Sequence, residues 1–201
     1  MKKIMLVGLG LLGFTILNAQ DILLKNSPFH FVDATFNLSI EKELDGNKSV
    51  NYSGGIHLTE NGWNYEDEIG LTAEIQLRKY VLKFKNSESN LNGIYVSPFG
   101  MLSYFKMNHT YRDWRYEYDD LGNYIASWDE EISVTASSKF GQAGIVMGVQ
   151  YVMSNVLVFD FFLGGGIQYS VEAGNRRSTN YDARFYTGVI PKIGFNFGVK
   201  L

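Results

Sequence analysis

The 201-residue sequence predicts an all-β fold, an eight-stranded antiparallel up-and-down β-barrel that crosses a membrane. Apolar and polar side chains alternate with a period of two over most of the chain, which is the pattern of strands with two unlike faces. The 14 Phe, 13 Tyr and 21 Gly favour strands that bend at glycine. The segments between the alternating stretches are alternately short and long, as in transmembrane barrels with short periplasmic turns and longer outer loops.

The alternation is clearest between residues 67 and 78. One parity there is apolar, and its members are Ile69, Leu71, Ala73, Ile75 and Leu77, while the other parity is polar. The same pattern along the chain predicts strands at 21–30, 33–43, 48–58, 66–82, 92–107, 139–153, 156–171 and 184–201. The first stretch has the weakest pattern, and without it the count would be seven.

The first 20 residues have the layout of a secretory signal peptide. Lys2 and Lys3 form a basic start, residues 4–17 are almost entirely apolar, and cleavage is expected after Gln20. An apolar run of this length is too short for a membrane-spanning helix. The mature domain is therefore expected at 21–201, and loss of the two lysines changes its formal net charge from −3 to −5.

Composition and spacing exclude several classes of protein. The absence of cysteine excludes disulfides, thiolate zinc sites and cysteine nucleophiles. The acidic balance makes a nucleic-acid partner unexpected. A Gly-x-Gly-x-x-Gly pattern at 8–13 lies inside the leader and is not a dinucleotide fingerprint. The acidic residues at 119–131 lack EF-hand spacing, so no metal site is expected, and no cofactor is expected either.

The apolar face is expected to meet lipid. Several stretches exceed the strand length of about five or six residues usual in soluble proteins, whereas a tilted membrane strand needs about nine to eleven. The opposite face carries five charged residues, which we expect to pair with one another in the lumen: Glu41, Glu74, Arg78, Asp160 and Lys192. The alternatives are an ion-selective lining for this set and a soluble secreted barrel for the fold.

Residues 108–138 are expected to form a long outer loop. This segment contains a set of aromatic and arginine side chains that make it a candidate binding surface: Tyr111, Arg112, Trp114, Arg115, Tyr116, Tyr118 and Trp128. Flat rings stack on saccharides or proteins, and guanidinium groups pair with acidic groups. An interface girdle is the alternative interpretation. A turn signal at 120–123 would let the flanking strands continue as a hairpin.

No catalytic residue is expected. His109 lies near the outer rim with Ser103, Asp113 and Ser127 nearby in the chain, which makes a lipid-modifying enzyme a distant alternative. A nucleophile, a base and an orienting group would have to meet within hydrogen-bonding distance. The sequence contains no Gly-x-Ser-x-Gly elbow.

Five stretches carry a family resemblance. They are Phe-Asn-Leu-Ser-Ile-Glu at 36–41, Glu-Ile-Gln-Leu-Arg-Lys-Tyr at 74–80, Gly-Ile-Tyr-Val-Ser-Pro-Phe at 93–99, Gly-Val-Gln-Tyr at 148–151 and Gly-Val-Lys-Leu at 198–201. Over most of 21–201 the chain resembles the small eight-stranded, porin-like outer-membrane barrels of Bacteroidetes, many of which are known only as domains of unknown function. The resemblance implies a fold and a location in the bacterial cell outer membrane, with both termini in the periplasm, and it carries no catalytic residues.

The same resemblance implies partners. The alternating end of the chain looks like the signal that the outer-membrane insertion machinery reads: Phe195, Phe197, Val199 and Leu201. Members commonly end in an aromatic residue, and Leu201 departs from that pattern. The implied partners are the lipid bilayer, periplasmic chaperones and this machinery, with a monomeric barrel and an unknown surface ligand. The expected role is structural, adhesive or surface-binding through the outer loops, and the alternative is a narrow passive pore.

Overall fold

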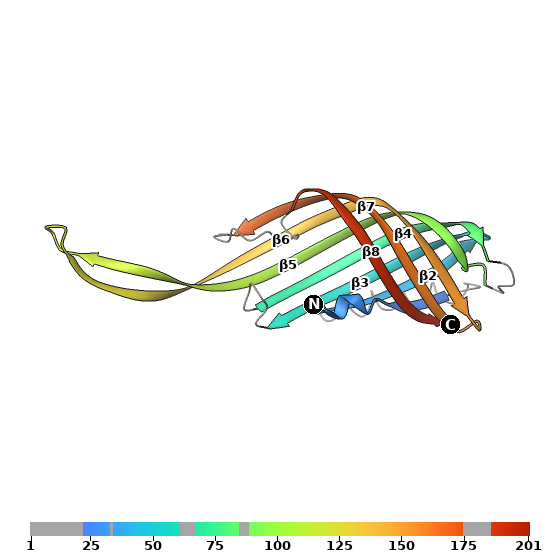
Figure 1. The fold of residues 1–201 in the computed structure, drawn as a ribbon, viewed down its shortest axis with the longest axis horizontal. Helices are drawn as coiled ribbons and strands as arrows, with labels where there is room; N and C mark the ends of the chain where they lie inside the picture. Colours follow the sequence, from blue (N-terminus) through green and yellow to red (C-terminus); the bar gives the residue numbers. More distant parts are fainter. Residues whose placement is uncertain (1–21, 33, 61–66, 85–88, 175–185) are drawn as a thin grey trace, which may run out of the picture.

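The computed structural model describes residues 22–32, 34–60, 67–84, 89–174 and 186–201. Eight antiparallel strands form one sheet that closes into a ring, because β1 pairs with both β2 and β8 (Figure 1). The strands are β1 (Ile22–Asn26), β2 (Thr35–Asp45), β3 (Lys48–Glu60), β4 (Asp67–Lys83), β5 (Gly93–Tyr118), β6 (Tyr124–Met153), β7 (Leu157–Gly174) and β8 (Gly188–Lys200). The predicted all-β class with eight antiparallel strands is confirmed. No helix in the described residues is both long and apolar enough to cross a membrane. The expected leader lies outside the described residues.

The first strand is shorter than predicted. Within the expected stretch 21–30, β1 occupies Ile22–Asn26, and the single-turn helix α2 (Phe29–Val32) follows it. Proline cannot donate to a strand ladder, so Pro28 ends the extended segment. The backbone then turns, with His30 N donating to the Ser27 carbonyl and Phe31 N to the Pro28 carbonyl. The ring is consequently closed by four residue pairs between β1 and β8.

Tight turns gather at one end of the ring, together with the start of β1 and the end of β8. Ser154 and Asn155 between β6 and β7 both have positive φ, at 51° and 56°, which the favoured two-residue hairpin turns require. Gly46 between β2 and β3 also has a positive φ of 47°. Leu201 N donates to the Ile22 carbonyl at this end. We call it the turn end.

Most of the segment 108–138 is strand, and it forms the hairpin that the turn signal at 120–123 allowed, so only the expected strand ends at 107 and 139 are wrong. β4 accompanies β5 only to Asn108, and β7 accompanies β6 only from Ala136 onward. Beyond these points β5 and β6 pair with each other as far as Tyr118 and Tyr124, and no other described strand pairs with them. Figure 1 shows this two-stranded segment, 109–118 with 124–135, extending far beyond the ring. We call it the distal ribbon, and the end of the ring that carries it the ribbon end.

The apolar parity of the strands points away from the ring. On β4, Ile69, Leu71 and Leu77 expose 51%, 56% and 53% of their surface, whereas Gln76 and Arg78 of the other parity are buried. The same division holds on the other long strands, so large apolar side chains cover the outside and polar side chains fill the inside. The ring therefore has the reverse of the polarity of a soluble barrel.

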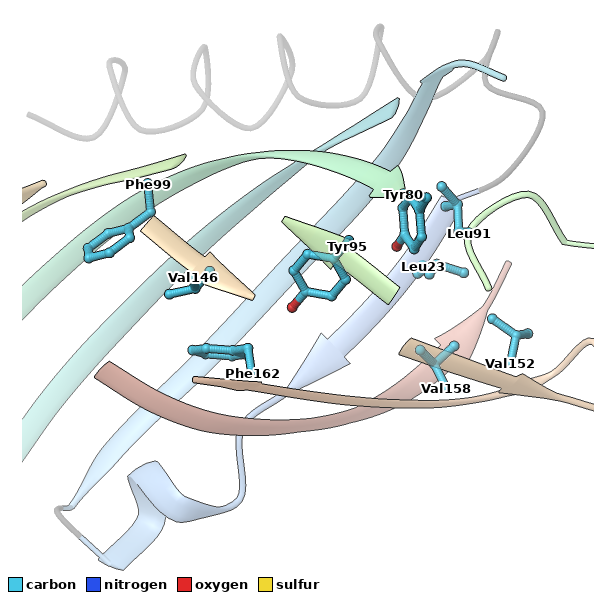
Figure 2. Packing of buried hydrophobic residues seen from close by; sticks show 9 residues of the cluster. All are labelled: Leu23, Tyr80, Leu91, Tyr95, Phe99, Val146, Val152, Val158 and Phe162. Carbon is cyan, nitrogen blue, oxygen red and sulfur yellow. The ribbon is translucent and has the colours of Figure 1, made fainter. Parts of the chain in front are cut away.

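Large aromatic side chains fit inside because each lies across a glycine on the neighbouring strand. Tyr95 crosses Gly148, Phe105 crosses Gly70, and Phe162 crosses Gly194, each pair in direct register. A Cβ atom added to these glycines would lie 2.2 to 2.4 Å from the ring. Figure 2 shows Tyr95 and Phe162 within the cluster of buried apolar side chains of the interior. Glycine thus supplies the room that an eight-stranded ring otherwise lacks.

The register of the closing seam is directly testable. Leu24 and Val199 are cross-strand partners on β1 and β8, where opposed Cα atoms lie about 4.5–5.5 Å apart and within the range for a disulfide. The chain has no cysteine of its own. The double variant Leu24→Cys, Val199→Cys should form an intramolecular disulfide in the folded protein, detected as a thiol-dependent shift on electrophoresis. Leu24→Cys with Ile193→Cys, displaced six residues or about 20 Å along β8, should not. Equal cross-linking of both pairs would contradict the seam.

Candidate functional site

Four fully buried charged side chains meet inside the ring near the turn end. Lys25 Nζ contacts Glu41 Oε2 and lies 3.2 Å from Asp160 Oδ2. Arg78 Nη1 lies 3.0 Å from Glu41 Oε2 and 2.9 Å from Asp160 Oδ2. Two cations therefore face two carboxylates, and the group is neutral as a whole. Burial of charge on this scale is tolerable only with such pairing.

Neutral side chains complete the hydrogen bonding of these charges. Gln150 Oε1 accepts from Lys25 Nζ at 2.9 Å and from Arg78 Nη1 at 3.0 Å. The Tyr80 hydroxyl donates to Glu41 Oε1 and the Tyr95 hydroxyl to Asp160 Oδ1, both at 2.8 Å. The Tyr95 ring also lies under the guanidinium of Arg78, at 4.3 Å from ring centroid to Cζ. Charge-assisted bonds of this kind are stronger than neutral ones and fix geometry.

The connected set reaches every strand of the ring, and we call it the inner network. Its members are Lys25 of β1, Glu41 of β2, Ser49 of β3, Arg78 and Tyr80 of β4, Tyr95 of β5, Gln150 of β6, Asp160 of β7 and Asn196 of β8.

The five predicted lumen residues fall into two ion-paired groups. Glu41, Arg78 and Asp160 belong to the inner network, whereas Lys192 Nζ pairs with Glu74 Oε2 at 2.9 Å further toward the ribbon end. Gln76 joins the groups, because its Oε1 accepts from the Arg78 guanidinium and its Nε2 donates to Glu74 Oε1. Sequence reasoning missed Lys25. Its inward parity with Leu23 was the available signal, but the first strand carried the weakest pattern.

A second polar group lies inside the ring near the ribbon end and centres on His57. Its Nδ1 lies 2.9 Å from Thr35 Oγ1, and its Nε2 lies 3.0 Å from Thr59 Oγ1 and 3.5 Å from Glu68 Oε2. The imidazole also meets the edge of the Phe105 ring, with centroids 5.6 Å apart. This buried arrangement orients the histidine and holds β2, β3 and β4 together. The side chain of His109, which the enzyme alternative requires, lies outside the described part of the chain.

The distal ribbon presents aromatic side chains to solvent. Trp114, Tyr116 and Tyr118 follow one another on one face of β5, and each exposes nearly three-fifths of its surface. Arg112 Nη1 on that face pairs with Asp129 Oδ2 of β6 at 3.2 Å. On the opposite face, Arg115 Nε pairs with Glu130 Oε2 at 2.8 Å and lies directly opposite Trp128. The side chain of Tyr111 lies outside the description.

The tip of the ribbon is a tight turn built around Asp119. Its Oδ1 accepts hydrogen bonds from the backbone N–H groups of Leu121 and Asn123, and its Oδ2 accepts from Asn123 Nδ2. These bonds, the one from the Asn123 side chain foremost, hold the pKa of Asp119 below its usual range. The ionised carboxylate therefore stabilises the turn at neutral pH, and this contribution is lost as the pH falls through the lowered pKa.

The ribbon carries the net charge of the chain. Residues 109–135 contain seven acidic and two basic side chains. Their excess of five negative charges equals the formal net charge of the whole expected mature domain, 21–201. The formal charges of the rest of that domain therefore balance, and the ribbon combines exposed aromatic side chains with the excess of negative charge.

The four predicted residues of the C-terminal insertion signal have the outward parity of β8. Phe197 and Leu201 expose 43% and 70% of their surface on the outward side of β8, which also carries Phe195 and Val199. The Phe197 and Phe159 rings lie 5.4 Å apart. In the part of the chain that the structure describes, no three His, Asp or Glu side chains are grouped as metal ligands.

Comparison with protein-family models, curated proteins and solved structures finds no match for this chain.

The inner network should dominate the stability of the ring. Arg78→Met would leave two buried carboxylates with one cation, so the free energy of unfolding should fall by about 3–5 kcal/mol. Lys192→Met removes a cation from a less buried pair whose Glu74 keeps its bond from Gln76, and it should cost less, about 1–3 kcal/mol. Urea titration in lipid vesicles, with the folded fraction read from heat-modifiable electrophoretic migration, measures both. Equal losses would show that the inner network has no special weight.

Proposed function

We propose that this chain is a bacterial outer-membrane β-barrel that displays the distal ribbon outside the cell as a binding surface. The observation that carries the proposal is the outward apolar surface of the ring, which ends in charged side chains at both ends. The resemblance to the Bacteroidetes barrels points the same way.

The outward charged side chains of the described strands lie at two levels. Lys42, Lys48 and Lys79 lie toward the turn end, and Asp67, Lys106 and Lys139 toward the ribbon end. The outward side chains between these levels are uncharged, with Ile69 to Leu77 as the example on β4. That stretch spans about 27 Å of strand, or roughly 20 Å of height at the usual tilt, close to the apolar band of about 25 Å in outer-membrane barrels. In water, a continuous apolar surface of this kind would cause aggregation.

The interior supports a structural role for the ring rather than a passive pore. Arg78, Glu41, Asp160 and Gln150 are fully buried and occupy the turn-end half of the lumen together with Tyr95. An eight-stranded ring leaves little space beyond its own side chains. The inner network closes that space with groups that are held by several bonds each.

The ribbon has the features of a binding surface. A two-stranded hairpin is marginally stable alone in water, and both of its edges have unpaired backbone groups for a partner to use. Trp114, Tyr116 and Tyr118 offer exposed rings on one face, and large aromatic side chains dominate the energy of interfaces. Because no other part of the described surface combines such rings with an excess of charge, we assign the binding role to the ribbon.

The proposed location makes the ribbon the accessible part of the protein. Trypsin added to intact cells should cut after Arg112 or Arg115 and leave the ring protected, because the ribbon stands outside the bilayer. The measurement is mass spectrometry of the fragments after outer-membrane fractionation. A variant in which Asn-Gly replaces residues 112–131 joins the paired Tyr111 and Ile132 by a two-residue turn and should lose the fragments that end at Arg112 or Arg115. Recovery of the chain in the soluble periplasmic fraction would contradict the location.

The binding role predicts dependence on the aromatic rings. Trp114→Ala with Tyr116→Ala should reduce attachment of expressing cells to a host-cell or matrix surface by tenfold or more, since anchor residues each contribute about 1–2 kcal/mol. Trp114→Phe with Tyr116→Phe retains the rings and should restore most of it. Flow cytometry against the ribbon verifies equal display. Attachment that is unchanged by the alanine pair would contradict the binding role.

A further inference from the structure

The outward face of β4 to β7 contains a groove of about 580 Å³ near the ribbon end. Two rows of directly opposed residues form it. The row nearer the ribbon contains Leu71, Tyr104, Lys139 and Val171, and the next row contains Ala73, Leu102, Gly141 and Tyr169. The groove is hollow because Gly141 has no side chain between Leu102 and Tyr169, which expose 72% and 66% of their surface. Its walls are almost entirely apolar.

Cations stand at the head of this groove. Lys139 lies two residues along β6 from Gly141, and its Nζ lies 5.9 Å from the centre of the Tyr104 ring. Lys106 is paired with Ser137, so it is the diagonal cross-strand neighbour of Lys139, at about 7–8 Å. The two lysines belong to the ribbon-end level of outward charges. Asp67, the acidic member of that level, lies one row further out than Lys106.

We propose that the groove holds an acyl chain of a phosphorylated glycolipid, with its phosphates on Lys139 and Lys106. The inference rests on the proposed function, because it needs the outward face to meet lipid. Apolar walls suit an acyl chain, lysine binds phosphate as a point charge, and tyrosines beside the lysines suit the boundary between chains and headgroups.

The position of the groove selects a glycolipid over a glycerophospholipid. The lysines are at the ribbon end, so they face the outer leaflet in the proposed orientation. Two lysines about 7–8 Å apart can each bind one anionic group of a headgroup that carries two, whereas a phospholipid such as phosphatidylglycerol offers one phosphate for both. The turn end supplies a matched contrast, because Lys48 and Lys79 are directly paired outward lysines that do not border this groove.

Native mass spectrometry tests the proposal on the full chain, expressed with its own leader and purified from membranes in detergent. Bisphosphorylated lipid A is added in one arm and phosphatidylglycerol in the other. The unaltered protein should retain one lipid A molecule more strongly than phosphatidylglycerol. Lys106→Gln with Lys139→Gln should weaken this retention by roughly tenfold to thirtyfold, since each lysine at a lipid surface contributes about 1 kcal/mol. Lys48→Gln with Lys79→Gln removes the same charge and should change it little.

A second variant tests the apolar part. A Cβ at Gly141 would lie 3.4 Å from the flexible end of Leu102, so Gly141→Leu fits the ring while filling the groove, and it should also lower lipid A retention. Equal retention of phosphatidylglycerol, or retention unchanged in the Lys106, Lys139 variant or in Gly141→Leu, would overturn the proposal. Folding into phosphatidylcholine vesicles separates the two ideas. A chain that does not fold there contradicts the proposed function as well, whereas one that folds but releases lipid A contradicts only the groove.

Discussion

The structure depends on pairing buried charge inside a ring that is too narrow to hydrate it. Lys25 and Arg78 face Glu41 and Asp160, and the strands that carry them lie on different sides of the ring. Each charge can be satisfied only if the strands are in the observed register, because a one-residue slip would turn the side chain outward. The inner network thus fixes the register of all eight strands. A uniform apolar exterior would not specify that register by itself.

The apolar exterior and the short closing seam follow from this interior. Polar side chains and aromatic rings fill the lumen, so the large aliphatic side chains, Leu, Ile and Val, lie on the outward face together with further aromatic residues. The number of exposed apolar side chains follows from this division and does not require a protein partner that covers them. The β1–β8 seam contains four residue pairs, yet Lys25 of β1 binds Glu41, Gln150 and Asp160 across the lumen. Contacts through the interior therefore hold the first strand in addition to its backbone ladders with β2 and β8.

The sequence predicted the parts of the fold that follow from a period of two. Local patterns are visible in a single sequence. They gave the number of strands, the apolar parity from Ile69 to Leu77 and the turn at 120–123. Lys25 could not be placed, because five residues before Ser27-Pro28 are too few to establish a parity. The extent of β5 and β6 was predicted only in part. The turn signal at 120–123 indicated a hairpin, but residues 109–118 carry polar or charged side chains on both faces, so the alternation fades although the ladder continues.

The net charge is divided unequally between the ring and the ribbon, and this division favours a ribbon that projects away from the ring. The ring with its connections is formally neutral, so in the location that we propose it has no net charge to interact with the anionic headgroups of the bilayer. The ribbon is acidic, and in the proposed location the same headgroups would repel it, which favours the extended position over one that lies flat on the membrane. The two arginines of the ribbon are paired with Asp129 and Glu130, so they would not attract the ribbon to the phosphate groups of lipid headgroups. Lys106 and Lys139 lie on the ring next to the start of the ribbon, and they are the cations that we propose contact the headgroups.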